Sequence, residues 1–368
     1  MILKSSKPVA SALLFSSLCF TACQGPAPAP HITSSTYPIS NIPPNYSPTH
    51  ATGTLGTLWR LDPALDSLIA PGARIEKLAQ GFDWTEGPVW VANGNYLLFS
   101  DILPNRVYRW DATNGLKPFL FPSGYTGIKP RSGEVGSNGL LLDPQGRLVL
   151  CQHGDRRIAR LDSTLDKPDS KFTTLAERFD GRRLNSPNDA CFHKNGDLYF
   201  TDPPYGLEKN IYDPAKEIAH QGVYRLAKDG TVTLLTDKMS RPNGIAFSPD
   251  QKTLYVANSD PNRAVWMAYE VLDDGKLGKS RVLFDATPFV KRGMKGLPDG
   301  MKVDRAGNLF ATGPGGVLVF NPAGNHLGTI HTGEATANCS WGDDGTVLYI
   351  TADMYLCRIK TKTKGIGF

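Results

Sequence analysis

The sequence predicts an all-β fold, a six-bladed β-propeller, and three observations support this prediction. One sequence pattern recurs six times, with starts about 40 to 56 residues apart, which is the period of a propeller blade. Glycine and proline are abundant, with 37 and 28 of the 368 residues, so the chain must make many turns. Beyond the N-terminal segment, no stretch has the sustained apolar periodicity of a helix.

Each copy of the repeat starts with a polar residue, continues into an apolar run, turns, and returns through a second apolar run. In one copy the first run is 138–142, the turn is 144–146 and the second run is 148–150. Gly and Asn at such turns supply the positive φ that tight hairpins need. Further strand-like runs follow, so each blade is expected to hold three or four antiparallel strands. The segment from Thr54 to Leu78 is expected to add outer strands that close the ring against the last blade, because ring closure protects sheet edges.

The chain is predicted to consist of a lipoprotein-type signal peptide at 1–22, a flexible tether at 23–55 and the propeller at 56–368. Two lysines precede a short apolar stretch, and the run Phe20-Thr21-Ala22-Cys23 resembles a bacterial lipobox. The tether is rich in Pro, Ser, Thr and Ala, a composition that cannot bury a core. We therefore expect an exported protein, a periplasmic or cell-surface lipoprotein with a lipid anchor at Cys23. Plain secretion after cleavage near Ala22 is the alternative.

The charge balance argues against a nucleic-acid partner. The net charge is +5, from 40 basic and 35 acidic residues, and the basic residues are scattered without forming a run that would follow a phosphate backbone. The sequence does not decide the oligomeric state. It also leaves open whether four cysteines in strand-like runs are buried thiols or form disulfides. These are Cys151, Cys191, Cys339 and Cys357.

The residues that open the six repeats all carry side-chain oxygens. Innermost strands line the axis of a propeller, so these side chains are expected to converge at one mouth of the central channel. Carboxylates and carboxamides are the ligands of a hard cation such as Ca²⁺, whereas zinc prefers His or Cys, which no repeated position carries. An Asx turn before each strand is the alternative, but six aligned oxygen side chains favour an axial metal site. The openers are Glu86, Asn138, Asn188, Asn243, Asp299 and Asn338.

A second set of polar residues lies 14 or 15 positions after the openers, where the returning strand reaches the same mouth. His153 ends a strand there and is a candidate substrate contact, with a structural role as the alternative. Asp101, Asp202 and Asn258 occupy equivalent places, and the two aspartates either border the site or cap loops. The loops at 124–137 and 203–221 contain many polar and aromatic residues and are candidates for a lid.

Several of these segments resemble the family of regucalcin (senescence marker protein) and gluconolactonase, over roughly residues 80 to 355. The matching motifs are Glu86-Gly87-Pro88-Val89-Trp90, Arg183-Leu184-Asn185-Ser186-Pro187-Asn188-Asp189, Thr201-Asp202-Pro203-Pro204-Tyr205-Gly206, Arg241-Pro242-Asn243-Gly244-Ile245-Ala246-Phe247 and Leu297-Pro298-Asp299-Gly300-Met301. The resemblance implies a six-bladed propeller with a divalent cation, usually calcium, on its axis.

The resemblance also implies roles for particular residues. Glu86, Asn243 and Asp299 match the family's metal ligands, and Asn188 matches a residue that contacts substrate and, in some relatives, the metal. Asp299 further matches the family's proton acceptor and donor. Where regucalcin-like members have a sugar-contacting arginine, this chain has Ser186, so Arg183 or Asn185 is expected to replace that contact. Together with Asn188, Asn138 and His153, these two form the expected substrate-binding set.

These observations predict a metal-dependent hydrolase of a sugar lactone, in which water attacks a carbonyl polarised by an axial cation. Calcium is the expected ion, with Mg²⁺, Mn²⁺ and Zn²⁺ as alternatives. No Ser lies in a Gly-x-Ser-x-Gly setting, which argues against a serine hydrolase. The main alternative is a non-catalytic propeller that binds a glycan or protein and uses calcium structurally. A quinone-dependent dehydrogenase is disfavoured because the openers offer no basic or aromatic residues for a planar cofactor.

Overall fold

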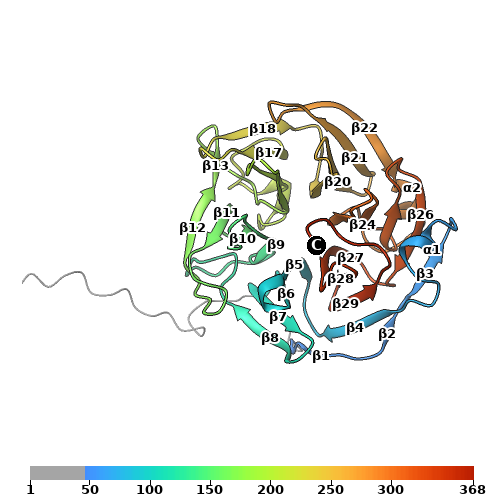
Figure 1. Cartoon of the computed structure of the whole chain (residues 1–368). Helices are drawn as coiled ribbons and strands as arrows, with labels where there is room; N and C mark the ends of the chain where they lie inside the picture. Colours follow the sequence, from blue (N-terminus) through green and yellow to red (C-terminus); the bar gives the residue numbers. More distant parts are fainter. Residues whose placement is uncertain (1–45) are drawn as a thin grey trace, which may run out of the picture.

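The computed structural model describes residues 46–368, which form six sheets around a central axis (Figure 1). Within these residues the structure is almost entirely β, with two short α-helices, α1 (Leu65–Leu68) and α2 (Thr287–Lys291). Two single turns of 3₁₀ helix lie at Ala92–Gly94 and Asn210–Tyr212. The six-bladed β-propeller predicted from the repeat is therefore confirmed. The signal peptide, Cys23 and most of the expected tether lie outside the described residues.

Blades 1 to 4 each consist of four antiparallel strands, which follow one another in chain order from the axis outward. Blade 1 comprises β5 (Thr85–Val91), β6 (Tyr96–Asp101), β7 (Arg106–Asp111) and β8 (Gly115–Leu120). Blade 2 comprises β9 (Ser137–Leu142), β10 (Leu148–Gln152), β11 (Arg157–Leu161) and β12 (Phe172–Ala176). Blade 3 comprises β15 (Ala190–Phe192), β16 (Leu198–Asp202), β17 (Gly222–Leu226) and β18 (Val232–Thr236). Blade 4 comprises β19 (Pro242–Phe247), β20 (Thr253–Asp260), β21 (Arg263–Val271) and β22 (Leu277–Asp285).

Blades 5 and 6 combine C-terminal strands with strands from the start of the domain. Blade 5 comprises β23 (Met301–Val303), β24 (Leu309–Gly313), β25 (Gly316–Phe320), β26 (His326–His331) and β3 (Thr57–Arg60). Blade 6 comprises β27 (Thr336–Gly342), β28 (Val347–Ala352), β29 (Tyr355–Lys360), β4 (Ile75–Gln80), β1 (Thr49–His50) and β2 (Thr54–Leu55). A separate hairpin, β13 (Arg178–Phe179) and β14 (Arg182–Arg183), lies between blades 2 and 3 in the chain.

The N-terminal strands close the ring, as predicted for the segment from Thr54 to Leu78. In Figure 1 the blue strands β3 and β4 lie beside the red strands of the last two blades. β4 pairs with β29, placing Ala79 opposite Leu356, and β3 pairs with β26, placing Leu58 opposite Ile330. The sheet extends further toward the N-terminus than expected. β1 falls in the 23–55 segment assigned to the tether, while β2 lies where that segment overlaps the predicted closing segment, and both pair with β4.

The core lies between the blades. In residues 46–368, buried apolar side chains form six clusters, each shared by two neighbouring sheets. One cluster joins Val149 of blade 2 to Phe200 of blade 3, and another joins Phe310 of blade 5 to Trp341 of blade 6. The second strand of five blades is buried along its whole length, because it packs against a blade on each side.

The cysteines contribute to this core as free thiols. Cys151, Cys339 and Cys357 are buried, Cys191 is half-buried, and none of the four forms a disulfide. Burial raises the pKa of each thiol, so all four are held in the unreactive protonated form. In the part of the chain that the structure describes, no helix combines the length and apolar character needed to cross a membrane.

The glycine that follows an opener allows neighbouring inner strands to approach closely at the axis. A Cβ on Gly244 would lie 2.1 Å from the carbonyl oxygen of Asp299 in the next blade, and one on Gly87 would lie 2.1 Å from that of Asn138. Gly87 also has a φ of +48°, which disfavours other residues. The repeated opener-glycine pair therefore brings the opener of one blade against that of the next.

Candidate functional site

Five of the six openers line one cavity at the axis. Glu86, Asn138 and Asn243 lie near the starts of β5, β9 and β19, while Asn188 and Asp299 lie just before β15 and β23. The cavity has a volume of about 470 Å³, within the range of small-molecule sites. The other lining residues are Trp84, Glu134, Tyr205, Arg241, Ser259, Pro261, Val290, Gly296, Leu297, Ala335 and Thr336.

Four openers present a buried oxygen that has no hydrogen-bond partner among residues 46–368. An unpaired buried oxygen is costly, and most such atoms in proteins are hydrogen-bonded. Four of them on residues that line a single cavity indicate that a ligand from outside the chain completes the site. The atoms are Asn138 Oδ1, Asn188 Oδ1, Asn243 Oδ1 and Asp299 Oδ1.

The sixth opener, Asn338, does not line the cavity but positions Glu86. Its Nδ2 donates to Glu86 Oε2 at 3.1 Å, and its Oδ1 accepts the backbone N–H of Cys339 at 2.9 Å. The same Glu86 oxygen accepts the N–H of Gly87 at 2.8 Å. Two donors therefore hold one carboxylate oxygen of Glu86, which fixes the orientation of the group.

The carboxylates of the site repel one another in a buried setting. Burial, together with the charges of Asp189 and Glu134, raises the pKa of Glu86 to about 8. Burial and the charge of Glu86 raise the pKa of Asp299 well above its usual value. Asp189, directly after an opener, is also buried, and burial raises its pKa while Lys302 lowers it. Excess negative charge with unpaired oxygens is the setting in which a cation binds favourably.

The residues present fit an oxygen-coordinated cation more closely than a soft metal. Among residues 46–368, no three His, Cys, Asp or Glu side chains come together in a way that would hold an ion. The donors at the axis are instead two carboxylates, Glu86 and Asp299, and the carboxamides of Asn188 and Asn243. Such a mixture of charged and neutral oxygens is typical of sites for calcium.

The residues at the ends of the second strands cap loops. Asp101 accepts the backbone N–H of Trp84 at 2.9 Å, and Asp202 accepts those of Asn185 and Ser186 at 2.8 Å each. Asn258 accepts the N–H of Arg241 at 2.9 Å. The capped N–H groups belong to residues two or three positions before an opener, so these caps fix the chain as it enters the site.

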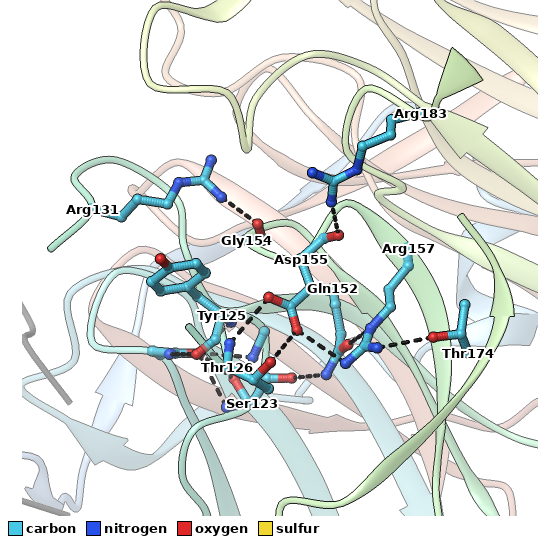
Figure 2. Close-up of polar contacts among 12 residues, drawn as sticks. Ser123, Tyr125, Thr126, Arg131, Gln152, Gly154, Asp155, Arg157, Thr174 and Arg183 are labelled. Atoms are coloured by element: carbon cyan, nitrogen blue, oxygen red, sulfur yellow. Dashed lines mark hydrogen bonds and ion pairs between the residues drawn. The ribbon is translucent and has the colours of Figure 1, made fainter. Parts of the chain in front are cut away.

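Three predicted substrate contacts do not line the cavity. Figure 2 shows the Arg183 side chain directed to the carbonyl oxygen of Asp155, at 2.7 Å. The Asn185 amide donates to the carbonyl oxygens of Asp202 and His220, at 3.1 and 2.9 Å. Backbone acceptors distant in sequence thus hold both side chains away from the axis.

The third of these, His153, is fully buried behind a cavity residue. Its Nδ1 lies 3.0 Å from Oε2 of Glu134, which does line the cavity. Ser186, in the position where relatives were expected to have an arginine, donates to the carbonyl oxygen of Pro203 at 2.6 Å. That serine therefore anchors a loop and leaves the cavity wall to other residues.

Sequence reasoning missed a second tier of lining residues that the repeat itself encodes. Trp84, Arg241, Leu297 and Thr336 each lie two positions before an opener and line the cavity with it. Alternate residues of an extended chain face the same side, so this position was predictable from the openers. Glu134 and Tyr205 were not, because they come from the loops at 124–137 and 203–221, which follow no repeat.

The family model described as "SMP-30/Gluconolactonase/LRE-like region" matches residues 84–353. A gluconolactonase of Zymomonas mobilis is 41% identical over 321 residues, which cover 85% of this chain and 88% of that protein. The solved structure of a gluconolactonase from Xanthomonas campestris has a TM-score of 0.72 at 32% identity, covering 86% of this chain and 100% of that one. A calcium-binding regucalcin from Agrobacterium tumefaciens shares the fold, with a TM-score of 0.60 at 22% identity over 77% of this chain and 92% of that one. The chain therefore belongs to the SMP-30/gluconolactonase/LRE-like family.

Proposed function

We propose that this protein is a hydrolase of sugar lactones that works with a calcium-type cation at the propeller axis. The observation that carries the proposal is the set of unpaired buried oxygens on Asn138, Asn188, Asn243 and Asp299 in one cavity beside Glu86. The family relationship supplies the reaction class, because the gluconolactonases of Zymomonas mobilis and Xanthomonas campestris match nearly the whole propeller.

The cation would be held by Glu86, Asn188, Asn243 and Asp299, with Mg²⁺ and Mn²⁺ as alternatives to Ca²⁺. When bound, such a cation supplies positive charge that polarises a lactone carbonyl and stabilises the oxyanion formed on attack. The hydrogen bonds from Gly87 and Asn338 keep Glu86 oriented for this role. Protein oxygens then provide the donor set, and the cavity above them provides space for substrate.

The chain's own residues bind the substrate and move its protons. Asp299 removes a proton from the attacking water, consistent with an Oδ1 that accepts no hydrogen bond from residues 46–368. Asn188 and Asn138 present amide groups that orient the lactone. Arg241 and Tyr205 line the same cavity and offer donors to the hydroxyls of a sugar ring. Trp84 and Leu297 add an apolar wall that excludes water from the ring face.

The test is a hydrolysis screen with a pH indicator, using aldonolactones and aryl esters in parallel, with and without a chelator. We expect turnover of aldonolactones that the chelator abolishes and that added calcium restores. A protein that binds calcium firmly and hydrolyses nothing in the panel would instead be a non-catalytic propeller with a structural ion, and the proposed function would be wrong.

We also propose that the protein is exported and lipid-anchored through Cys23. The lipobox-like run and the tether composition support this. Cys23→Ser should therefore release the protein from the membrane fraction and remove the mass of the lipid. A Cys23→Ser protein that still fractionates with membranes would contradict the anchor.

A further inference from the structure

A carboxylate outside the donor set also lines the cavity. Glu134 comes from the loop between β8 and β9, and its side chain is 32% exposed at the cavity wall. Behind it, His153 is completely buried, and the two side chains meet at 3.0 Å between Oε2 and Nδ1. The pair therefore has one member open to a substrate and one sealed in the protein.

The two ring nitrogens of His153 differ in their distance to Glu134. Both are buried, and neither forms a well-aligned hydrogen bond with residues 46–368. Nδ1 nevertheless lies 3.0 Å from Oε2 of Glu134, within the reach of proton transfer. A proton carried by the pair is therefore held between these two atoms, on Nδ1 or on the carboxyl group.

The loop that carries Glu134 is fastened to the strand end that carries His153. Figure 2 shows two of these contacts. The Thr126 hydroxyl donates a hydrogen bond to the Asp155 carboxylate at 2.6 Å, and the Gln152 amide donates one to the Ser123 carbonyl oxygen at 2.8 Å. Closer to the pair, the N–H of His153 donates to the carbonyl oxygen of Gly136 at 3.2 Å. These contacts tie the loop at 124–137 to the strand end that carries His153 and help to set the distance between Glu134 and His153.

The loop at 203–221 packs closely against His153. A Cβ on Gly206 would lie 2.6 Å from Cβ of His153, so this glycine lets the loop approach the strand end that carries His153. Arg131, on the same loop as Glu134, directs its guanidinium to the carbonyl oxygens of Gly154 and Gly206. It thereby links both loops to the strand end beside His153.

The charged and titratable groups that share the cavity with Glu134 are Glu86, Asp299, Tyr205 and Arg241. The charge of Glu134 contributes to the raised pKa values of Glu86, Asp299 and Tyr205, which places it within electrostatic range of the reacting centre. It differs from Glu86 and Asp299 in lying outside the donor set, so a bound cation would leave its carboxyl group available to exchange a proton.

We propose that Glu134 is the catalytic acid that protonates the leaving oxygen of the lactone, and that His153 is its positioning residue. The inference rests on the proposed function. The water oxygen bonds to the carbonyl carbon while Asp299 takes one water proton. The bond between that carbon and the ring oxygen then breaks, and its electron pair stays on the ring oxygen, which takes the proton shared by Glu134 and His153. Asp299 loses its proton to solvent and the pair regains one, so one water is consumed and one hydroxy acid is formed.

Leaving-group chemistry separates this role from a structural one. The ring oxygen of a lactone leaves as an alkoxide, which needs a proton, whereas p-nitrophenolate leaves readily without one. Glu134→Gln keeps the size of the side chain and its hydrogen-bonding groups but cannot transfer a proton. We expect it to lower kcat for an aldonolactone by about 100- to 1,000-fold and to change kcat for p-nitrophenyl acetate by less than about threefold.

His153→Gln should give the same selectivity with a smaller loss, about tenfold on the lactone. The matched control is Glu208→Gln. Glu208 belongs to the loop at 203–221, its Oε1 lies 4.0 Å from Nε of Arg131, and it does not line the cavity. We expect it to behave like the wild type. Calcium affinity, measured on all variants, should fall only modestly in Glu134→Gln, because its charge acts on Glu86 and Asp299 from outside the donor set. The melting temperature shows whether each variant is folded under the assay conditions.

An unchanged lactone rate in Glu134→Gln, or an equal loss on lactone and aryl ester, would overturn the acid role while leaving the proposed function intact. If Glu134→Gln fails to fold, the selectivity of His153→Gln decides the matter by the same criterion. A wild-type protein that does not hydrolyse lactones would overturn the proposed function, and the acid role with it.

Discussion

At the scale of single residues, the buried carboxylates carry most of the chemistry. Lys302 lowers the pKa of Asp189 and so offsets part of its charge. For Glu86 and Asp299 the main influences on the pKa are burial, neighbouring carboxylates and hydrogen bonds. Their charges are therefore the ones that a bound cation would balance, with the amide oxygens of Asn188 and Asn243 completing the coordination.

Two substitutions at the axis should separate metal binding from catalysis. Asp299→Asn keeps the shape of the side chain but removes its charge, so we expect weaker calcium binding and no turnover even at saturating calcium. Asn188→Ala removes one neutral oxygen from the donor set and leaves both charged ones, so we expect calcium still to bind, with lower affinity, and a loss of about 100-fold in kcat at saturating calcium. Calorimetric calcium titration and lactone kinetics on both variants measure this, and unchanged turnover in Asp299→Asn would refute the mechanism.

Calcium affinity should rise with pH. The pKa of Glu86 is raised from 4.5 to about 8, and that of Asp299 is raised as well, so both hold protons that a cation must displace. In the metal-free protein the same shifts make the folded state bind more protons than the unfolded chain, so its stability falls as pH rises through this window. Between pH 5 and 8 we therefore expect affinity to increase, by at most about tenfold per pH unit for each group. An affinity independent of pH would contradict the raised pKa values.

The openers were predictable from the sequence because one residue type recurs at one place in each blade. The substrate-contact candidates were less predictable, since hydrogen-bond partners far along the chain decide where a side chain points. The Arg183 side chain donates to the carbonyl oxygen of Asp155, and the Asn185 side chain donates to that of His220. Neither partner has a local sequence signal.

At the scale of elements, the inner strands depend on small residues and hydroxyls at fixed places in the repeat. Thr312, near the end of β24, donates to the carbonyl oxygen of Ala337 in the next blade at 2.7 Å. Thr201, near the end of β16, donates in the same way to that of Asn243, also at 2.7 Å. These bonds satisfy carbonyl groups that face a neighbouring blade, and they hold the openers in one tier.

Gly244→Ala should disturb this packing directly. Its Cβ would lie 2.1 Å from the carbonyl oxygen of Asp299, so inner strands of blades 4 and 5 must separate. We expect a loss of about 1–3 kcal/mol in unfolding free energy and weaker calcium binding, measured by denaturant unfolding and titration. Gly72→Ala is the control, because a Cβ there meets no atom within 4 Å. Equal stability of the two variants would contradict the close-approach argument.

At the scale of the whole molecule, the ring is held closed by strands from both ends of the domain. The blade number and the closing segment followed from the repeat and from the need to cover sheet edges. The first strand, β1, was not predicted, because the composition of 46–53 gives no indication of its pairing with β4. A short polar strand depends on the edge it joins, here that of β4, and β4 is itself held in the sheet by β29, 275 or more residues later in the chain.

Removing the closing strands should therefore lower the stability of the domain far more than removing residues 1–45. A chain beginning at residue 82 lacks β1 to β4 and leaves the edge of β29 unpaired, so we expect cooperative unfolding to be lost or to occur at much lower denaturant, with aggregation. A chain beginning at residue 46 keeps every described strand and should unfold like the full protein. Circular dichroism during denaturant unfolding compares them, and equal midpoints would show that closure by β4 is dispensable.

The central claim is that the oxygen donors at the axis bind a divalent cation on which lactone hydrolysis depends. The most direct test is to titrate calcium into chelator-treated protein while recording cation binding and aldonolactone hydrolysis in the same sample. We predict that turnover is absent at the start, rises in proportion to bound calcium and saturates at one ion per chain. Full turnover in the chelated protein, or saturated calcium binding without turnover, would contradict this account.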